Sequence, residues 1–171
     1  ALYRTHGITK NPDFLTKNDG GWYYEMQELG YNYRITDIQA ALGISQLRRL
    51  DWSIQRRNEI AQKYDDSFKS LPIKIPFRNK NIRHAFHLYV IQVDADKRKE
   101  LYNFLKENKI YSQVLYIPAH TMPYYKSLGW KEGDFPVAED YYSKCLALPM
   151  FPSLTEEEQE YVIEKICCFY N

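Results

Sequence analysis

The pattern of apolar positions predicts one long helix in the first half of the chain. From Leu47 onward, apolar side chains recur every three to seven residues, and charged side chains occupy most of the positions between them. Thr36 and Gln39 match a capping box, in which two side chains reciprocally satisfy backbone N–H groups at a helix start. Pro72 lacks a backbone donor and ends the pattern. We therefore expect a single helix over residues 36–69, long enough to connect two bodies.

The chain beyond this helix alternates between strand and helix patterns. A small sheet backed by helices, and hence the α/β class, is expected. Asp96 is the predicted N-cap of the first of these helices, Asn108 is its predicted left-handed closing residue, and Thr155 with Glu158 forms a second capping box. The predicted strands are 86–93, 111–117 and 146–150, and the predicted helices begin near Asp96, span 136–145 and follow Thr155.

The same patterns predict a core that includes both the long helix and the sheet. Leu105→Ala should then be strongly destabilising, because it would leave a cavity on the buried face of a helix. The ten predicted core residues are Leu42, Leu47, Leu50, Ile54, Leu88, Val90, Leu101, Leu105, Val162 and Ile166.

Composition excludes several function classes. The 171 residues carry 23 Lys and Arg against 22 Asp and Glu, so the net charge is +1 and there is no large basic field for nucleic acid or anionic membrane. No apolar run approaches the roughly 18 residues of a membrane helix, and the start does not resemble a signal peptide. We expect a cytoplasmic protein without nucleic-acid or membrane partners. Its three cysteines indicate neither a disulfide framework nor a zinc knuckle.

A loop just before the predicted helix carries the first candidate chemistry. Asn32 and Arg34 place an amide donor and a guanidinium two residues apart, next to the free N–H groups of a helix start. This set of donors would suit a phosphate. A turn in which Asn32 bonds its own backbone and Arg34 is solvated fits the same spacing, so spacing alone leaves both interpretations open.

The histidines give weaker indications. His84 and His87 would point to opposite faces of a strand, so packed or hydrogen-bonded imidazoles are favoured over a metal site, and no metal is predicted. His120 lies in a loop, where contact with a substrate and a hydrogen bond to backbone are equally compatible with the sequence.

A longer string of residues carries a family resemblance. Residues 30–43, GYNYRITDIQAALG, resemble the hallmark segment of the DegT/DnrJ/EryC1/StrS family of pyridoxal-phosphate-dependent nucleotide-sugar aminotransferases. Residues 22–29 are similar to the enzymes of this family that place a 4-amino group on a UDP-linked altrosamine precursor. The resemblance extends through the short motifs at 3–8, 87–89, 116–120, 123–125 and 148–155.

This resemblance implies a fold, a cofactor and a set of site residues. The fold would be the C-terminal part of a fold-type-I transferase, and the enzyme a homodimer that moves an amino group from glutamate to a 4-keto nucleotide sugar. Asn32 would bond the phosphate of pyridoxal 5′-phosphate in the partner subunit's active site, with Arg34 beside it. Tyr116 and His120 match the loop on the sugar side. Leu115 stands where the family commonly has His, which weakens the expectation of polar substrate contacts there.

The resemblance also implies an organisation into three parts. Residues 1–35 would belong with a large domain and carry the hallmark loop, 36–70 would be the connecting helix, and 71–171 a small α+β domain. The lysine that holds the cofactor covalently would lie in an N-terminal large domain outside this chain, so we predict no catalytic residue here and no turnover by the chain alone. A non-catalytic sugar-binding or interaction module, and a related sugar dehydratase, remain as alternatives.

Overall fold

A computed structural model describes residues 1–17, 19–79 and 81–171, which separate into a first unit, Ala1–Arg49, and a second unit, Leu50–Asn171. The first unit is built on main-chain pairing rather than on a core. Its elements are η1 (Leu2–Arg4), β1 (Ile8–Thr9), η2 (Pro12–Phe14), β2 (Glu25–Met26) and α1 (Asp37–Leu47). Strands β1 and β2 pair antiparallel, with Ile8 opposite Met26.

Almost every described side chain of the first unit is accessible to solvent. Gly7 is the one buried residue among those described there. Apolar side chains of α1 that would normally be covered are exposed, including Ile38 at 84% and Leu42 at 61%. Because a helix of this length gains little stability without packing, α1 depends mainly on local features such as its capping box. That box is confirmed: Gln39 N–H donates to the Thr36 hydroxyl, and Thr36 N–H donates to the Gln39 side chain.

The single helix predicted over residues 36–69 is wrong. The structure has two helices, α1 and α2 (Leu50–Phe68), with a turn at Arg48 and Arg49 between them. Arg49 N–H bonds the carbonyl of Gln46, three residues back rather than four, so the helix tightens and ends. No residue of α1 is buried, and no packing therefore holds the chain to one continuous helix across this turn.

The second unit contains the sheet and the helices that cover it. Strand β3 (Tyr89–Gln92) pairs antiparallel with β4 (Cys145–Leu148), and isolated bridges add Lys74 on one side and Gln113 on the other. The predicted strand over 111–117 is reduced to the bridge at Gln113, because the chain then leaves the sheet edge. The helical elements of this unit are α2, α3 (Ala95–Glu107), η3 (Ala119–Thr121), α4 (Pro123–Ser127), α5 (Pro136–Lys144) and α6 (Glu156–Tyr170).

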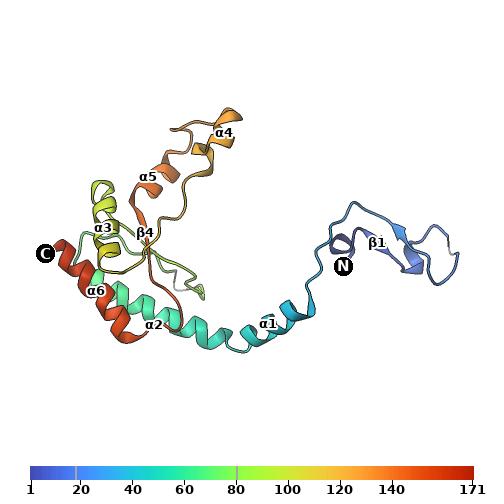
Figure 1. Cartoon of the computed structure of the whole chain (residues 1–171), viewed down its shortest axis with the longest axis horizontal. Coiled ribbons are helices and arrows are strands. Elements are labelled where there is room, and N and C mark those ends of the chain that lie inside the picture. Colours follow the sequence, from blue (N-terminus) through green and yellow to red (C-terminus); the bar gives the residue numbers. More distant parts are fainter. Residues whose placement is uncertain (18, 80) are drawn as a thin grey trace. The chain divides into compact units, whose positions relative to one another are not determined.

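Figure 1 shows two parts within this unit. Helices α2 and α6 pack against each other, and α3 packs on α6, to form its body. The segment from Gln113 through η3, α4 and α5 forms an arm (Figure 1), which meets the body where α5 contacts α3 and β3, and β4 then returns to the sheet. The arm has few buried side chains, and those that it does bury become important for the candidate site below.

Helix ends in this unit follow the predictions in part. The capping box of Thr155 and Glu158 is confirmed at the start of α6. Asp94, not Asp96, occupies the N-cap position of α3. Asn108 is not left-handed: its φ is −84°, and its side chain donates to the carbonyl of Phe104 at 2.8 Å. The following residue, Lys109, adopts the positive φ of 60° instead.

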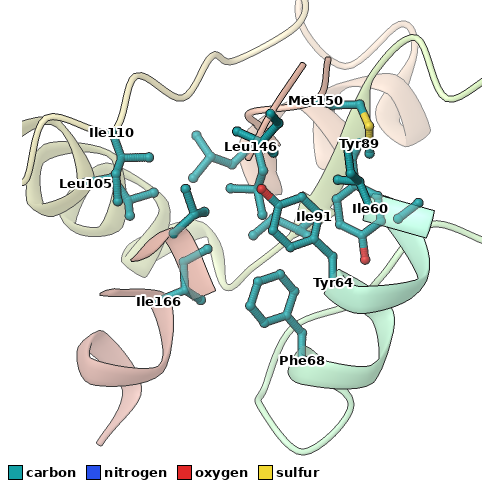
Figure 2. Close-up of a cluster of buried hydrophobic side chains, with 14 of the residues drawn as sticks. Ile60, Tyr64, Phe68, Tyr89, Ile91, Leu105, Ile110, Leu146, Met150 and Ile166 are labelled. Carbon is teal, nitrogen blue, oxygen red and sulfur yellow. The ribbon is translucent and has the colours of Figure 1, made fainter. Parts of the chain in front are cut away.

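The core lies between the helices and one face of the sheet. Figure 2 shows Tyr64 and Phe68 of α2, Tyr89 and Ile91 of β3, and Ile166 of α6 converging on it. The rings of Tyr64 and Phe68 stack with centroids 5.6 Å apart. Because a strand alternates its faces, burial of the Tyr89 and Ile91 side chains turns the intervening residues to the other face.

Four of the ten predicted core residues are buried, namely Leu101, Leu105, Val162 and Ile166. Ile54, Leu88 and Val90 are half-buried, and Leu42, Leu47 and Leu50 are exposed. Where both faces of a strand are apolar, the sequence cannot indicate which one meets the helices. The prediction that Leu42 and Leu47 are buried is wrong because it treats the apolar seam as one helix with one buried face, whereas α1 is a separate helix with no buried residue.

We predict that Leu105→Ala destabilises the second unit by about 2–5 kcal/mol, because Leu105 is fully buried between α3 and its neighbours. Leu42→Ala is the matched control, since its side chain is exposed on α1 and should change stability by less than about 0.5 kcal/mol. Urea denaturation of the chain followed by circular dichroism measures both. Equal effects of the two substitutions would contradict this assignment of the core.

Candidate functional site

The hallmark loop is held in an extended conformation against the N-terminal segment. Asn32 forms an antiparallel bridge with Thr5, and the backbones of Tyr31 and Tyr33 bond residues 3–6 at 2.7–3.0 Å. The rings of Tyr31 and Tyr33 stack with centroids 4.9 Å apart, so both lie on one side of the loop. Because side chains alternate along an extended segment, the Asn32 side chain points to the other side.

Two glycines permit this close approach of the backbones. A Cβ placed on Gly30 would lie 2.1 Å from the Gly7 nitrogen, and one on Gly7 would lie 1.7 Å from the carbonyl oxygen of Glu28. Gly7 also adopts a φ of +70°, which side chains disfavour. Any larger residue at either position would displace the loop that carries Asn32.

The side chains of Asn32 and Arg34 are free to bind a ligand. Both are exposed, and neither forms a side-chain hydrogen bond or an ion pair with any residue that the structure describes. The turn in which Asn32 bonds its own backbone is therefore not observed. A carboxamide and a guanidinium with unused N–H groups, just before Thr36 and the start of α1, suit an anion such as a phosphate.

A second polar cluster orders the loop that precedes the hallmark segment. The Glu25 carboxylate accepts hydrogen bonds from the backbone and hydroxyl of Thr16, from the Tyr23 hydroxyl at 2.7 Å and from the Gln27 amide at 2.9 Å. The Thr16 hydroxyl contributes most, and together these donors lower the pKa of Glu25 to about 2. The sequence analysis did not single out Glu25, because its partners lie up to nine residues away.

The two residues on the predicted sugar side lie in the arm of the second unit and differ in exposure. Tyr116 is 76% exposed, whereas His120 is only 8% exposed. The Nε2 atom of His120 lies 2.7 Å from a carboxylate oxygen of Glu139 on α5. His120 therefore bonds a carboxylate and not backbone, and its Nδ1 atom forms no hydrogen bond with the described residues.

Glu139 is the residue of this region that the sequence analysis missed. Its carboxylate also accepts from the backbone N–H of Gly133 at 2.8 Å and from that of Phe135 at 3.4 Å. The bond from His120, followed by that from Gly133, lowers the pKa of Glu139. One side chain thus fastens η3 and the loop before α5 to α5 itself. Nineteen residues separate Glu139 from His120, and no spacing rule indicates such a pair.

The structure groups the four predicted residues into two pairs. Asn32 and Arg34 belong to the first unit, and Tyr116 and His120 belong to the second. Within each pair, the residues share one local framework: the hallmark loop for the first, and the start of the arm for the second.

Residues 1–167 match the DegT/DnrJ/EryC1/StrS aminotransferase family. The chain belongs to this family. The match spans nearly the whole chain, including both the loop with Asn32 and Arg34 and the arm with Tyr116 and His120.

Curated relatives of the family include enzymes of several sugar pathways. The chain is 44% identical to the spore coat polysaccharide biosynthesis protein SpsC of Bacillus subtilis, over 94% of this chain and 43% of SpsC. It is 33% identical to a UDP-4-amino-4,6-dideoxy-N-acetyl-beta-L-altrosamine transaminase of Campylobacter jejuni, over 94% of this chain and 42% of that enzyme. The chain thus spans less than half the length of these relatives.

Solved structures confirm the predicted fold. PseC of Helicobacter pylori, an aminotransferase of pseudaminic acid biosynthesis, superposes with a TM-score of 0.83 at 28% identity, over 99% of this chain and 44% of PseC. Spr1654 of Streptococcus pneumoniae in its PLP form gives a TM-score of 0.83 at 29% identity, over 95% of this chain and 40% of that protein. The chain therefore has the fold of the C-terminal part of a fold-type-I, pyridoxal-phosphate-dependent transferase.

The described residues contain neither a metal-binding cluster nor a membrane-spanning helix. Within 1–17, 19–79 and 81–171, no three His, Cys, Asp or Glu side chains come together as a metal site would require. No helix in these ranges combines the length and apolar character needed to cross a membrane.

We predict that Glu25 titrates near pH 2 in the folded chain, compared with its ordinary value of 4.5. Because its folded pKa is depressed, its contribution to the order of this loop is complete above about pH 4.5 and is lost as the pH falls through about 2. The carboxyl carbon shift of Glu25, followed by NMR, measures this midpoint. Thr16→Ala should move it upward, and a midpoint near 4.5 in the unmodified chain would contradict the geometry.

Proposed function

We propose that this chain is the C-terminal portion of an aminotransferase that moves an amino group from glutamate to the 4-keto carbon of a nucleotide sugar, for a surface polysaccharide or glycan. The observation that carries the proposal is the pair of unused donors, Asn32 and Arg34, held within the hallmark loop of a family of sugar aminotransferases. The relatives named for polysaccharide and amino-sugar biosynthesis support the substrate class.

The residues present fit the phosphate of pyridoxal 5′-phosphate. The Asn32 carboxamide would donate to a phosphate oxygen, and Arg34 would add a guanidinium next to it. When bound, the cofactor supplies the electron sink that amino transfer requires. The chain's own contribution is to bind and orient: the bridge between Asn32 and Thr5 and the close contact of Gly7 with Gly30 fix where these donors lie.

On the sugar side, Tyr116 and His120 are the proposed contacts. The exposed phenol of Tyr116 can donate or accept a hydrogen bond. His120 is oriented by Glu139, so its Nδ1 atom is the part left for a ligand. Leu115, where the family commonly has His, offers no polar side chain, and we expect contacts at this point to come from Tyr116 instead.

We expect the chain to require a large domain for activity. We assign no lysine here to the covalent attachment of the cofactor. Two charge-assisted hydrogen bonds of about 1.5–3 kcal/mol each give about 3–6 kcal/mol, which corresponds to roughly millimolar binding before ordering costs are subtracted. The proposed assembly is a homodimer in the cytoplasm, in which Asn32 would serve the partner subunit's site.

Absorbance of bound cofactor tests the proposal. The chain is incubated with pyridoxal 5′-phosphate alone and together with the large domain of a family member, and glutamate-dependent amination of UDP-linked 4-keto sugars is then assayed on the mixture. A band and activity that occur in the mixture and not with the chain alone are expected. No absorbance band in either sample would favour the non-catalytic module. Elimination of water from the sugar without amination would favour the dehydratase.

Asn32→Ala should weaken cofactor binding in that mixture by about 10- to 100-fold, because it removes one hydrogen bond to a charged phosphate. Asn103→Ala is the matched control, since Asn103 is an exposed asparagine on α3 that is not part of the hallmark loop. Cofactor titration followed by absorbance gives both dissociation constants. Equal constants for the two variants would remove Asn32 from the phosphate site.

A further inference from the structure

The arm of the second unit contains a hollow whose walls are aromatic. It measures about 400 Å³ and is lined by His120, Tyr125, Trp130 and Phe135, with Pro118 and Ala138 among its smaller neighbours. This volume lies in the range of small-molecule sites. The rings of Tyr125, Trp130 and Phe135 are between 42% and 47% exposed, so each presents an open surface instead of being buried in a core.

The rings form a connected series. The centroid of Phe135 lies 4.8 Å from that of His120 and 5.6 Å from that of Trp130, so Phe135 links the imidazole to the indole. These distances are typical of aromatic pairs in contact. His120, Phe135 and Trp130 therefore line the hollow as a row of neighbouring rings, with the imidazole of His120 at its polar end.

Polar contacts hold these walls in place without a ligand. Glu139 bonds His120 and the backbone N–H groups of Gly133 and Phe135, which flank the turn before α5. An ion pair of 2.8 Å between Lys126 and Glu132 spans the turn that carries Trp130. Because these bonds already order the segment, a ligand would lose little affinity to ordering of the walls.

We propose that this hollow binds the nucleobase of the nucleotide sugar by stacking on the rings of Phe135 and Trp130. The proposal rests on the proposed function for the sugar part of the ligand. The base itself is inferred from the chemistry of the walls, because every nucleobase has a flat face suited to an aromatic ring, and such stacking contributes about 1–3 kcal/mol per base.

A sugar ring fits the same hollow less well. A pyranose would bring several hydroxyl groups against walls whose side-chain polar groups are the His120 imidazole, the Tyr125 hydroxyl and the Trp130 indole N–H, and each buried hydroxyl left without a partner costs about 1–3 kcal/mol. His120 Nδ1 is the imidazole atom left without a hydrogen bond in the described residues, and it could satisfy one such group. The hollow thus favours a ring with a large flat face and few polar groups.

The neighbouring hollow provides a place for the rest of the ligand. It measures about 660 Å³, includes Tyr116 and Asp134, and shares Pro118, Phe135 and Ala138 with the aromatic hollow. Phe135 therefore stands between the proposed site for the base and Tyr116, one of the two residues proposed to contact the sugar, while His120, the other, is the polar end of the aromatic hollow.

Saturation-transfer NMR on the full 171-residue chain tests this site with uridine 5′-monophosphate and guanosine 5′-monophosphate as probes. Base protons should receive more saturation than ribose protons. Ribose 5-phosphate and N-acetylglucosamine, which lack a base, should show little. Equal saturation of base and ribose, or equal binding of the probes without a base, would overturn the proposal.

Variants separate stacking from general damage to the fold. Phe135→Ala and Trp130→Ala should each raise the dissociation constant of the nucleotides by about 5- to 150-fold, and Trp130→Phe should restore most of the binding because it keeps a ring. Phe151→Ala is the control, since Phe151 is a similarly exposed aromatic that lines a different hollow. Circular dichroism confirms folding of each variant, and unchanged binding in both folded alanine variants would overturn the proposal.

The outcome is independent of the test of amino transfer. If cofactor binding and transamination occur in the mixed enzyme but both alanine variants bind nucleotides normally, the base site is wrong and the proposed function stands. If the nucleotides bind in the hollow but no cofactor band or amination is found, the proposed function is wrong and the base site stands.

Discussion

In the second unit, side chains of α2 donate hydrogen bonds to backbone carbonyls that flank the sheet, and the packing of the helices on the sheet depends on these bonds. Arg57 Nη1 lies 2.9 Å from the carbonyl oxygens of Phe86 and Met150 and 3.3 Å from that of His87, so one guanidinium joins the segment entering β3 to the segment leaving β4. The Tyr64 hydroxyl donates to Pro149, and Gln159 of α6 donates to Ile60 of α2. Partly buried carbonyls without such donors would be costly, so the sheet and its helices stabilise each other.

The anchoring of β3 and β4 by α2 also explains why the arm can extend from the body. Once Arg57 and the core residues fix β3 and β4, the chain between Gln113 and β4 is free to extend, because its ends are already anchored in the sheet. Hydrogen bonds within the arm then hold its segments together, and Glu139 forms two of them, with the His120 side chain and with the backbone N–H of Gly133. Both hollows proposed to hold the ligand are built on this fastened segment, so binding there would follow from the stability of the arm rather than of the core.

The first unit, in contrast to the second, has almost no buried core among its described residues. It has main-chain pairing, two close glycines and the Glu25 cluster, but among its described residues Gly7 alone is buried. Its apolar side chains, such as Leu42 and Leu47, remain accessible. With so little apolar burial, the backbone of this unit is held by its main-chain bonds and by the Glu25 cluster.

The sequence by itself determined both capping boxes, the type of most elements, and, through the hallmark segment, the family. These follow from short-range chemistry: an N-cap bonds a residue three positions away, and a motif is contiguous. The tertiary structure decided which face of β3 meets the helices, that the chain turns at Arg48 and Arg49, and that Glu139 bonds His120. Those depend on contacts between residues far apart in the chain or on the absence of packing around α1, and neither leaves a period or a spacing that the sequence alone can show.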